Sequence, residues 1–380
     1  MENFTIYNPS KVIFGENSLA QISNEAKKLG KKILLVYGQS SIKKTGLYDR
    51  IIHSLEDFDI VEYSGIKPNP VIDDVNKAAD IARQNQVEMI IAVGGGSVID
   101  SAKLISVAQH FEGDAWAIMK HEFQPTIATP IIAVLTLAAT GTEMNPFAVV
   151  QNPQTQEKIG WGSPLTYPKV SILDPNLTTT VPVDYTAFGL ADMVAHVLEA
   201  YFGDGDSPLS DSFAFSIIKE IIQIGDELLE NPEDYQLRAR AMYAGTMALN
   251  GLLTQGKKGG DWGVHAIGHT LSMLYDTPHG ATLTIAYPAW MKFHSEKLEH
   301  RIEKLGKGVF GVEDKQTTIH LFEEFFTQIG CPINLEEIGL NQENKSEIVE
   351  LLNKNHASGV FHSLDENARE YIVNLMFLKA

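Results

Sequence analysis

In the first half of the chain, short apolar runs alternate with amphipathic segments of helical length. A continuous apolar run of about four to eight residues is typical of a strand that is buried on both faces. The alternation therefore predicts an α/β fold of the Rossmann-like kind, with a parallel sheet covered by helices on both faces. The expected strands are residues 33–37, 60–63, 89–93, 130–135, 147–150 and 169–173, and the expected helices are residues 42–55, 71–85 and 97–110. The alternation in FTIYNPSKVIFG (residues 4–15) predicts two further short strands around a turn at Asn8 and Pro9.

The pattern changes near Pro182, after which apolar residues recur with helical spacing and no further buried strand is expected. With 380 residues, the chain is long enough for two domains. We therefore expect an α/β domain at residues 1–180 and an all-α domain at residues 181–380. The expected helices of the second domain include residues 184–202, 209–229, 232–253 and 262–274.

Composition and charge exclude several classes of partner. Apolar residues make up 44% and charged residues 21% of the chain, which is typical of a soluble globular protein. A net charge of −18 argues against a nucleic acid or an anionic membrane as partner. The single cysteine, Cys331, excludes an internal disulfide and fits a reducing compartment. Without a signal peptide or an apolar run of membrane-spanning length, a cytoplasmic location is expected.

Histidines with helical spacing suggest a metal site in the second half. His265 and His269 are four residues apart on an expected helix, and His279 follows the proline that ends this helix. Asp192 and His196 are also four apart, in a mostly apolar helix where a carboxylate is costly to bury alone. One oxygen and three imidazole nitrogens suit a divalent metal such as iron(II) or zinc. The alternative is that each is a hydrogen-bonded core residue.

Two loops in the first half suggest a nucleotide. Three glycines, Gly94, Gly95 and Gly96, separate an expected strand from a helix, so a phosphate can approach the backbone and the free amides of the helix start. Ser97 and Asp100 have the spacing of a capping box, and a well-capped helix is the alternative reading. The second loop, residues 135–143, places hydroxyl groups and glycine at the end of the next strand, where α/β sheets bind ligands.

The loop after the first long strand bears on which nucleotide is bound. It contains Gly38, Ser40, Ser41, Lys43 and a second lysine, but no acid. An NAD site often has an acid here for the ribose 2′-hydroxyl, whereas NADP requires room and positive charge. The loop therefore favours NADP(H) over NAD(H), although a solvated helix start would also explain the lysines.

Several of these segments resemble the iron-containing (type III) alcohol dehydrogenase family. They are DMVAH, the spacing of the histidines at 265, 269 and 279, GGGSVIDSAK and LTLAATGTE. Within that family, YGQSSIKKTG and KKGGDWGVHAIGH are most similar to the butanol dehydrogenase and NADP-dependent aldehyde reductase branch. The resemblance implies a dinucleotide-binding domain, a helical metal domain, a cleft between them and a homodimer.

The resemblance also implies roles for individual residues. The metal ligands would be Asp192, His196, His265 and His279. The pyrophosphate and neighbouring groups would be held by Gly94, Gly95, Gly96, Ser97, Asp100, Thr136 and Thr140, and Lys158 would lie near the nicotinamide ribose. In branches that use NAD, an aspartate commonly stands near the position of Gly38, so its absence again points to NADP(H).

The expected function is hydride transfer between NADP(H) and a primary alcohol or aldehyde such as butanol or butyraldehyde, with one Fe²⁺ or Zn²⁺ polarising the substrate oxygen. His269 shares a helical face with His265 but lies outside the ligand set. It is expected either to relay a proton or to hydrogen-bond the substrate, and simple packing is the alternative. Two other classes remain open: a metal-dependent lyase related to dehydroquinate synthase, which uses NAD transiently, and a non-enzymatic metal-binding protein.

Overall fold

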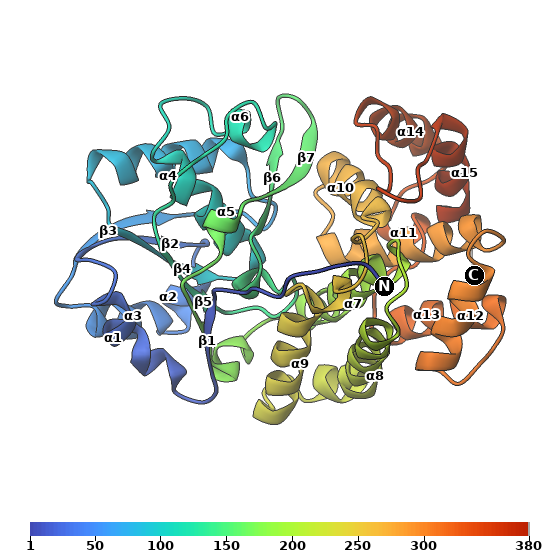
Figure 1. The fold of residues 1–380 in the computed structure, drawn as a ribbon, viewed down its shortest axis with the longest axis horizontal. Coiled ribbons are helices and arrows are strands. Elements are labelled where there is room, and N and C mark those ends of the chain that lie inside the picture. Colours follow the sequence, from blue (N-terminus) through green and yellow to red (C-terminus); the bar gives the residue numbers. More distant parts are fainter. Residues whose placement is uncertain (379–380) are drawn as a thin grey trace. The chain divides into compact units, whose positions relative to one another are not determined.

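The structure, a computed structural model, describes residues 1–378 (Figure 1). By its contacts the chain divides into two compact units. The α/β unit consists of Tyr7–Val181 and Pro232–Thr246. The helical unit consists of Met1–Ile6, Pro182–Asn231 and the chain from Met247 onward. Each unit has its own hydrophobic interior and is described separately below.

The α/β unit is built on a six-stranded sheet in which every neighbouring pair of strands is parallel. This sheet confirms the fold class that the alternation of strands and helices predicts. The strand order across the sheet is β1-β8-β5-β4-β2-β3. The strands are β1 (Lys11–Phe14), β2 (Lys32–Tyr37), β3 (Asp59–Ser64), β4 (Met89–Gly94), β5 (Ile131–Leu135) and β8 (Val170–Leu173).

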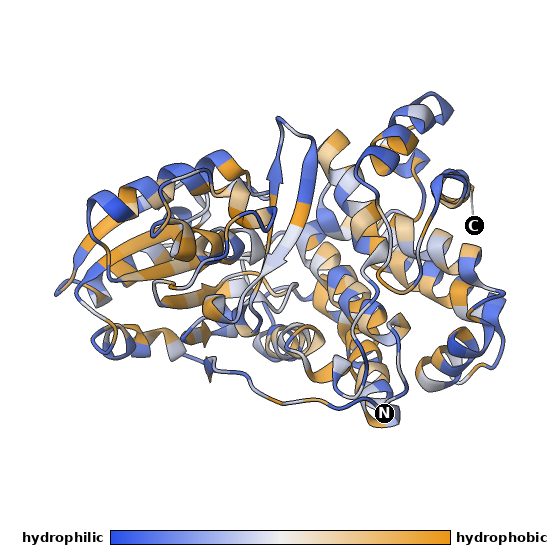
Figure 2. Cartoon of the chain, turned by 45° about the horizontal axis from the view of Figure 1, so that its top comes forward, coloured by the Kyte–Doolittle hydropathy of each residue, from blue (hydrophilic) through white to orange (hydrophobic). Residues whose placement is uncertain are grey.

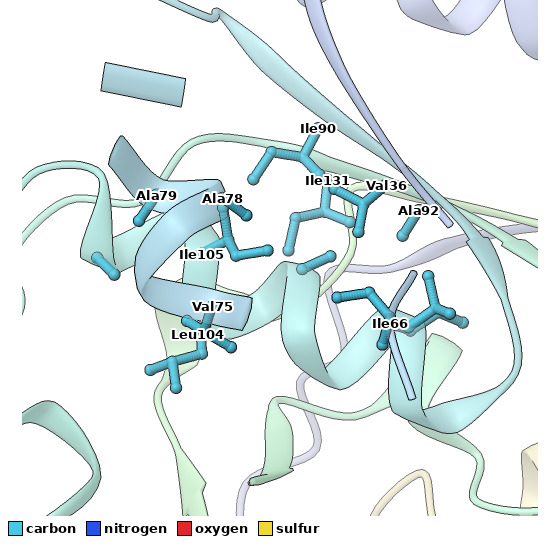
Figure 3. Close-up of a cluster of buried hydrophobic side chains, with 14 of the residues drawn as sticks. Val36, Ile66, Val75, Ala78, Ala79, Ile90, Ala92, Leu104, Ile105 and Ile131 are labelled. Atoms are coloured by element: carbon cyan, nitrogen blue, oxygen red, sulfur yellow. The ribbon is translucent and has the colours of Figure 1, made fainter. Parts of the chain in front are cut away.

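Successive side chains of the central strands enter two separate hydrophobic clusters, one on each face of the sheet. On one face, Val36, Ile90 and Ile131 pack against α4 and α5, and Figure 3 shows their side chains facing Ala78 and Ile105 of these helices. The opposite face packs against α1, α2 and α3. Burial on both faces explains why these strands are continuously apolar. The helices of this unit are α1 (Ile22–Ala26), α2 (Ser41–Lys44), α3 (Leu47–Ser54), α4 (Ile72–Gln84), α5 (Gly96–Ala108), α6 (Trp116–Met119) and α9 (Tyr235–Ala248), the last ending just beyond the unit.

Three local expectations differ from the structure. Residues 4–7 form no strand, so only the second half of the predicted N-terminal pair exists, as β1. The expected helix at 42–55 is divided into α2 and α3 at Gly46, whose φ of 74° is left-handed. The strand predicted at 147–150 exists as β6 (Phe147–Asn152), but it lies outside the main sheet and forms an antiparallel hairpin with β7 (Glu157–Gly162).

The helical unit contains no strand among its described residues. Helix α7 is buried along almost its whole length after Thr186, as expected for a helix that is apolar on most faces. Figure 2 shows that the hydrophilic residues of this unit gather on the outward faces of its peripheral helices. No helix between residues 1 and 378 combines the length and the hydropathy needed to cross a membrane. The helices are α7 (Val183–Phe202), α8 (Pro208–Glu230), α10 (Gly263–Tyr275), α11 (His279–His294), α12 (Glu299–Val309), α13 (Lys315–Gln328), α14 (Lys345–Lys354) and α15 (Glu366–Met376).

A buried carboxylate joins three segments of the helical unit. Asp211 of α8 is fully buried, and its Oδ1 lies 2.8 Å from Nζ of Lys257, whose side chain is also inaccessible. Its Oδ2 accepts hydrogen bonds from Arg301 at 2.7 Å and Lys304 at 2.8 Å, both in α12. Burial alone would raise the pKa of Asp211, but these cationic donors hold it well below its usual value.

We predict that Asp211→Asn lowers the free energy of unfolding by about 3–5 kcal/mol, because it leaves Lys257 buried without its counter-charge. Since the folded-state pKa is depressed, this stabilisation is present above the unfolded-state value of about 3.9 and is lost as the pH falls below it. Urea unfolding of both proteins should therefore give a large difference at pH 7 that shrinks below about pH 4. The exposed Asp206→Asn is the control and should change stability by less than about 0.5 kcal/mol. A difference of that small size for Asp211→Asn would contradict the assignment.

Candidate functional site

Three histidine side chains of the helical unit converge on one carboxylate oxygen. Oδ1 of Asp192 in α7 lies 3.4 Å from Nδ1 of His196, one turn further along the same helix. The same oxygen lies 3.8 Å from Nε2 of His265 in α10 and 3.9 Å from Nε2 of His279, the first residue of α11. Ligand atoms of Asp192, His265 and His279 all lie within 4.8 Å of one another. The structure thus brings together three of the four predicted ligands, and His196 lies beside Asp192 without being part of that group.

Glycines allow the helices that carry these residues to approach closely. A Cβ at Gly280, next to His279, would lie 2.1 Å from the carbonyl oxygen of Phe188 in α7. A Cβ at Gly268 in α10 would lie 2.8 Å from the hydroxyl of Thr282 in α11. A larger residue at Gly280 would push α11 away from the backbone of α7, whereas one at Gly268 would displace the side chain of Thr282.

The donor set fits a divalent cation. Nδ1 of His196 and Nε2 of His265 are buried and make no hydrogen bond to any described residue. A buried polar atom left in this state costs about 1–3 kcal/mol, and coordination to a cation would remove that cost. One carboxylate with imidazole nitrogens is a set that iron(II) and zinc accept. The only thiol of the chain belongs to Cys331, which is buried and is not a member of this group of candidate ligands.

The two best-buried histidines have opposite pKa shifts. Burial lowers the pKa of His196 to about 4, so its ring is neutral near pH 7, as a metal ligand must be. Burial also acts to lower the pKa of His265, but Asp192 and Glu199 outweigh it and raise the value to about 9. A cation that binds Nε2 of His265 must therefore displace a proton at neutral pH.

His269 lies beside this group without belonging to it. It is one turn after His265 on α10, and its ring centroid lies 6.3 Å from that of His265 and 5.2 Å from that of His279. Its side chain is partly exposed. The structure therefore places it next to the candidate ligands, at a distance where it can contact a molecule bound there.

Glu199 is a residue of this region to which the sequence analysis gives no role. It is a buried carboxylate in α7, and its Oε1 accepts a hydrogen bond of 2.9 Å from Nδ1 of His265. The signal was available in the sequence: an acid seven residues after Asp192, on the same face of an apolar helix, requires a buried partner.

The two glycine-containing loops of the α/β unit touch each other. Strands β4 and β5 are neighbours with Gly94 paired to Leu135, so both loops begin at the same edge of the sheet. A Cβ at Gly96 would lie 2.8 Å from Cγ2 of Thr140, which explains the need for glycine there. Gly95 is the residue before α5, and the amide of Thr136 donates to the carbonyl of Gly94 at 3.0 Å. The free amides of the first turn of α5 are thus next to the second loop.

The capping box predicted for Ser97 and Asp100 is wrong. Gly95 precedes the first residue of α5, Ser97 lies inside the first turn, and no side chain caps this helix. The hydroxyl of Ser97 donates to the carbonyl of Pro68. The carboxylate of Asp100 accepts hydrogen bonds from the hydroxyl of Thr142 at 2.6 Å and from the amide of Val149 at 2.9 Å. Asp100 therefore ties α5 to the segment that follows the second loop.

A buried lysine that the sequence analysis does not mention extends this network. Nζ of Lys103 donates to the hydroxyl of Thr142 at 2.6 Å, the side chain of Asn145 at 3.0 Å and the carbonyl of Phe147 at 2.6 Å. Burial lowers the pKa of Lys103 to about 8, although Asp100 and Glu143 act to raise it. The second loop is consequently anchored by charged hydrogen bonds.

The remaining candidate cofactor residues lie at other places in the α/β unit. Lys158 of β7 is buried, and its Nζ donates to the side chain of Asn69 at 2.8 Å. Asn69 was not anticipated, because it is 89 residues away in a loop. Gly38 follows β2, and Ser40 and Ser41 begin the short helix α2.

Lys43 of α2 is held above two aromatic rings. Its Nζ lies 4.7 Å from the ring centroid of Tyr48 and 5.4 Å from that of Tyr37. The hydroxyls of both tyrosines donate to Glu62, each at 2.7 Å. The carboxylate of Glu62, on strand β3, is therefore near the loop. It could not be recognised from the sequence pattern, because Glu62 is not part of the loop.

Comparisons with known proteins agree with this fold. Residues 9–175 match the family model described as iron-containing alcohol dehydrogenase. Residues 186–377 match the model of the C-terminal part of the Fe-containing alcohol dehydrogenase family. The chain belongs to the iron-containing alcohol dehydrogenase family. It is therefore a metal-dependent alcohol dehydrogenase or aldehyde reductase, which sets aside the lyase and the non-enzymatic protein as readings of the sequence.

Individual relatives cover nearly the whole chain. The probable NADH-dependent butanol dehydrogenase 1 of Bacillus subtilis (strain 168) is 41% identical over 96% of this chain and 97% of its own. The NADPH-dependent aldehyde reductase of Escherichia coli (strain K12) is 34% identical over 95% of this chain and 94% of its own. The crystal structure of NADH-dependent butanol dehydrogenase A from Thermotoga maritima superposes with a TM-score of 0.96 at 39% identity, covering 100% of this chain and 99% of that one.

We predict that Asp192→Ala and His279→Ala each lower the affinity for Fe²⁺ or Zn²⁺ by about tenfold or more, because each removes a donor atom. Turnover should fall with the metal, whereas binding of the dinucleotide should persist. Elemental analysis after dialysis and fluorescence titration with NADPH measure the two effects. His300→Ala, which changes an exposed histidine of α12, is the control and should retain full metal content. Normal turnover by a metal-free Asp192→Ala protein would contradict the assignment.

Proposed function

We propose that the protein transfers a hydride between NADP(H) and a primary alcohol or aldehyde, such as butanol or butyraldehyde. The observation that carries the proposal is the convergence of three histidine nitrogens within 3.9 Å of one oxygen of Asp192, in a chain of the iron-containing alcohol dehydrogenase family. A divalent cation at this site, Fe²⁺ or Zn²⁺, would supply the Lewis acidity that polarises an alcohol or carbonyl oxygen.

The metal ligands in this proposal are Asp192, His196, His265 and His279. The protein would hold this carboxylate and these three imidazoles in place before the substrate arrives. Little reorganisation would then accompany the reaction. His269 is proposed as the catalytic side chain that contacts the substrate oxygen. Its partly exposed ring beside His279 supports this role.

The α/β unit is proposed to bind the dinucleotide. The amides at the start of α5, with Gly94, Gly95, Gly96 and Ser97, would receive the pyrophosphate, since a helix start favours an anion. Thr136 and Thr140, in the neighbouring loop, would contact groups beside the pyrophosphate. Lys158 would contact the nicotinamide ribose. For Asp100 we propose an indirect role, because its two oxygens hold Thr142 and Val149. It would position the phosphate loop and would not touch phosphate.

These assignments give the two parts of the chain different functions. We propose residues 1–180 as the dinucleotide-binding domain and residues 181–380 as the metal-binding catalytic domain. The compact units depart from these bounds in two segments, since Met1–Ile6 belongs to the helical unit and Pro232–Thr246 to the α/β unit. We also propose a homodimer, as the family resemblance implies. Light scattering should then give about twice the mass of the 41.9 kDa chain, and the mass of one chain would refute the dimer.

We infer a preference for NADP(H) from residues 38–44. Gly38, Ser40, Ser41 and Lys43 include no acid. The nearby carboxylate of Glu62 accepts hydrogen bonds from the hydroxyls of Tyr37 and Tyr48. The cation of Lys43 is already restrained by Tyr37 and Tyr48, which reduces the entropy lost when it meets an anion. Among the relatives, the printed names include both NADH-dependent and NADPH-dependent enzymes, so the two cofactors must be compared directly.

The test is net reduction of butyraldehyde, followed at the nicotinamide absorbance with NADPH and NADH in parallel. We predict turnover with both and a higher kcat/KM with NADPH. Gly38→Asp should lower NADPH affinity roughly 5- to 150-fold, about 1–3 kcal/mol for a repelled charged group, and NADH should suffer less. The substitution is sterically feasible, since a Cβ at Gly38 would meet only ordinary contacts at 3.6 Å and beyond.

Gly38→Asn is the matched control, because it adds the same bulk without the charge. It should weaken NADPH much less than Gly38→Asp does. An equal or higher kcat/KM with NADH in the unmodified protein would refute the NADP(H) preference and leave the dehydrogenase activity standing. The absence of any net cofactor oxidation would refute the activity itself.

We predict that His269→Ala lowers kcat by about 10²- to 10⁴-fold with metal content unchanged, because the ring contacts substrate and does not hold the metal. His269→Gln separates two roles. A rate restored by glutamine means that the ring positions substrate through a hydrogen bond, whereas a rate as low as that of alanine means that it transfers a proton. Near-normal kcat in both variants would show that His269 only packs against His279.

A further inference from the structure

A single buried carboxylate joins the helix that carries Asp192 to the start of the helix that carries His265. The side chain of Glu199 in α7 is only 1% exposed. Its Oε1 accepts two hydrogen bonds from His265, one from the backbone amide at 3.0 Å and one from ring Nδ1 at 2.9 Å. Its Oε2 accepts from the amide of Trp262 at 2.5 Å. Three donors at the start of α10 thus meet one carboxylate from another helix.

These bonds replace a cap that α10 does not supply for itself. Trp262 directly precedes the helix, has a left-handed φ of 65°, and provides no side-chain cap. The first amides of a helix have no partner within it, and an anion there also interacts favourably with the helix dipole. Glu199 therefore fixes both the position of the helix start and the place of His265 in its first turn.

The same carboxylate determines which ring nitrogen of His265 is available. An ionised carboxylate only accepts hydrogen bonds, so Nδ1 of His265 must carry the hydrogen that it donates. In the neutral ring the lone pair is then on Nε2, which lies 3.8 Å from Oδ1 of Asp192 and has no hydrogen-bond partner among the described residues. The geometry directs the donor nitrogen toward the other candidate ligands.

We propose that Glu199 is the positioning residue for the metal ligand His265, holding its tautomer and ring orientation through Nδ1. The proposal rests on the proposed metal site and adds a residue to it. His196 has no comparable support among the described residues, since the carboxylate that its ring meets, 3.4 Å from Nδ1, is that of Asp192, itself a proposed ligand. His265 is therefore the ligand whose orientation depends on a carboxylate outside the ligand set.

The test measures metal binding by the chelator-treated full-length protein, with Co²⁺ as the probe. Glu199→Gln should weaken Co²⁺ binding about 10- to 100-fold, the usual cost of losing such an outer partner. The visible absorption spectrum of bound Co²⁺ should also change, because the ring of His265 is no longer held in one orientation. A role confined to capping α10 would lower the melting temperature without altering the spectrum of the folded, loaded protein.

Two further variants complete the experiment. Glu323→Gln removes another buried carboxylate of the helical unit, which pairs with Lys292, and should leave Co²⁺ affinity and spectrum unchanged. Glu199→Asp keeps the charge but withdraws it by one methylene, and it should also weaken Co²⁺ if the glutamine variant fails to fold. Wild-type Co²⁺ affinity and spectrum in either folded Glu199 variant would overturn the proposal. Failure of the proposed function would give a different result: the wild-type protein would bind Co²⁺ but would not reduce an aldehyde.

Discussion

In the helical unit, the polar groups that are buried in apolar helices require hydrogen-bonding or coordinating partners, and the packing of these helices depends on that requirement. Asp192, His196 and His265 are 4%, 5% and 6% exposed, and each alone would destabilise the fold. Because they converge, one cation can satisfy all of them, and Glu199 satisfies the far side of His265. Glycines at 268 and 280 permit the close approach of α7, α10 and α11 in this region.

Most of the fold could be predicted because burial on both faces leaves a strong pattern in the chain. Strands β2, β4 and β5 are continuously apolar, and their side chains enter opposite clusters in alternation. The failures have local causes. Gly46 carries no pattern that distinguishes a helix break from a helix residue, and β7 alternates too weakly to be recognised, with the buried Lys158 standing at a core position.

The candidate site could be predicted in part for a related reason. Asp192 and His196, like His265 and His269, are neighbours on one helix, so their spacing in sequence reveals a shared face. Partners that meet only through the tertiary fold leave no such spacing. Asn69 meets Lys158 across 89 residues, and Glu199 meets His265 across 66. For these pairs the sequence shows only a polar residue among apolar ones. Such a residue requires a hydrogen-bonding partner, but the sequence does not identify that partner.

Asp100 and Lys103 hold the segment after β5 through charged groups that face the protein interior. Asp100 and Lys103 lie one turn apart in α5, and both hydrogen-bond the hydroxyl of Thr142, at 2.6 Å each. Lys103 is fully buried, so removing its carboxylate partner would leave an uncompensated charge and make any displacement of the segment costly. The backbone of the loop is thereby fixed before a ligand arrives. If this loop binds a phosphate, such preorganisation lowers the entropy lost on binding.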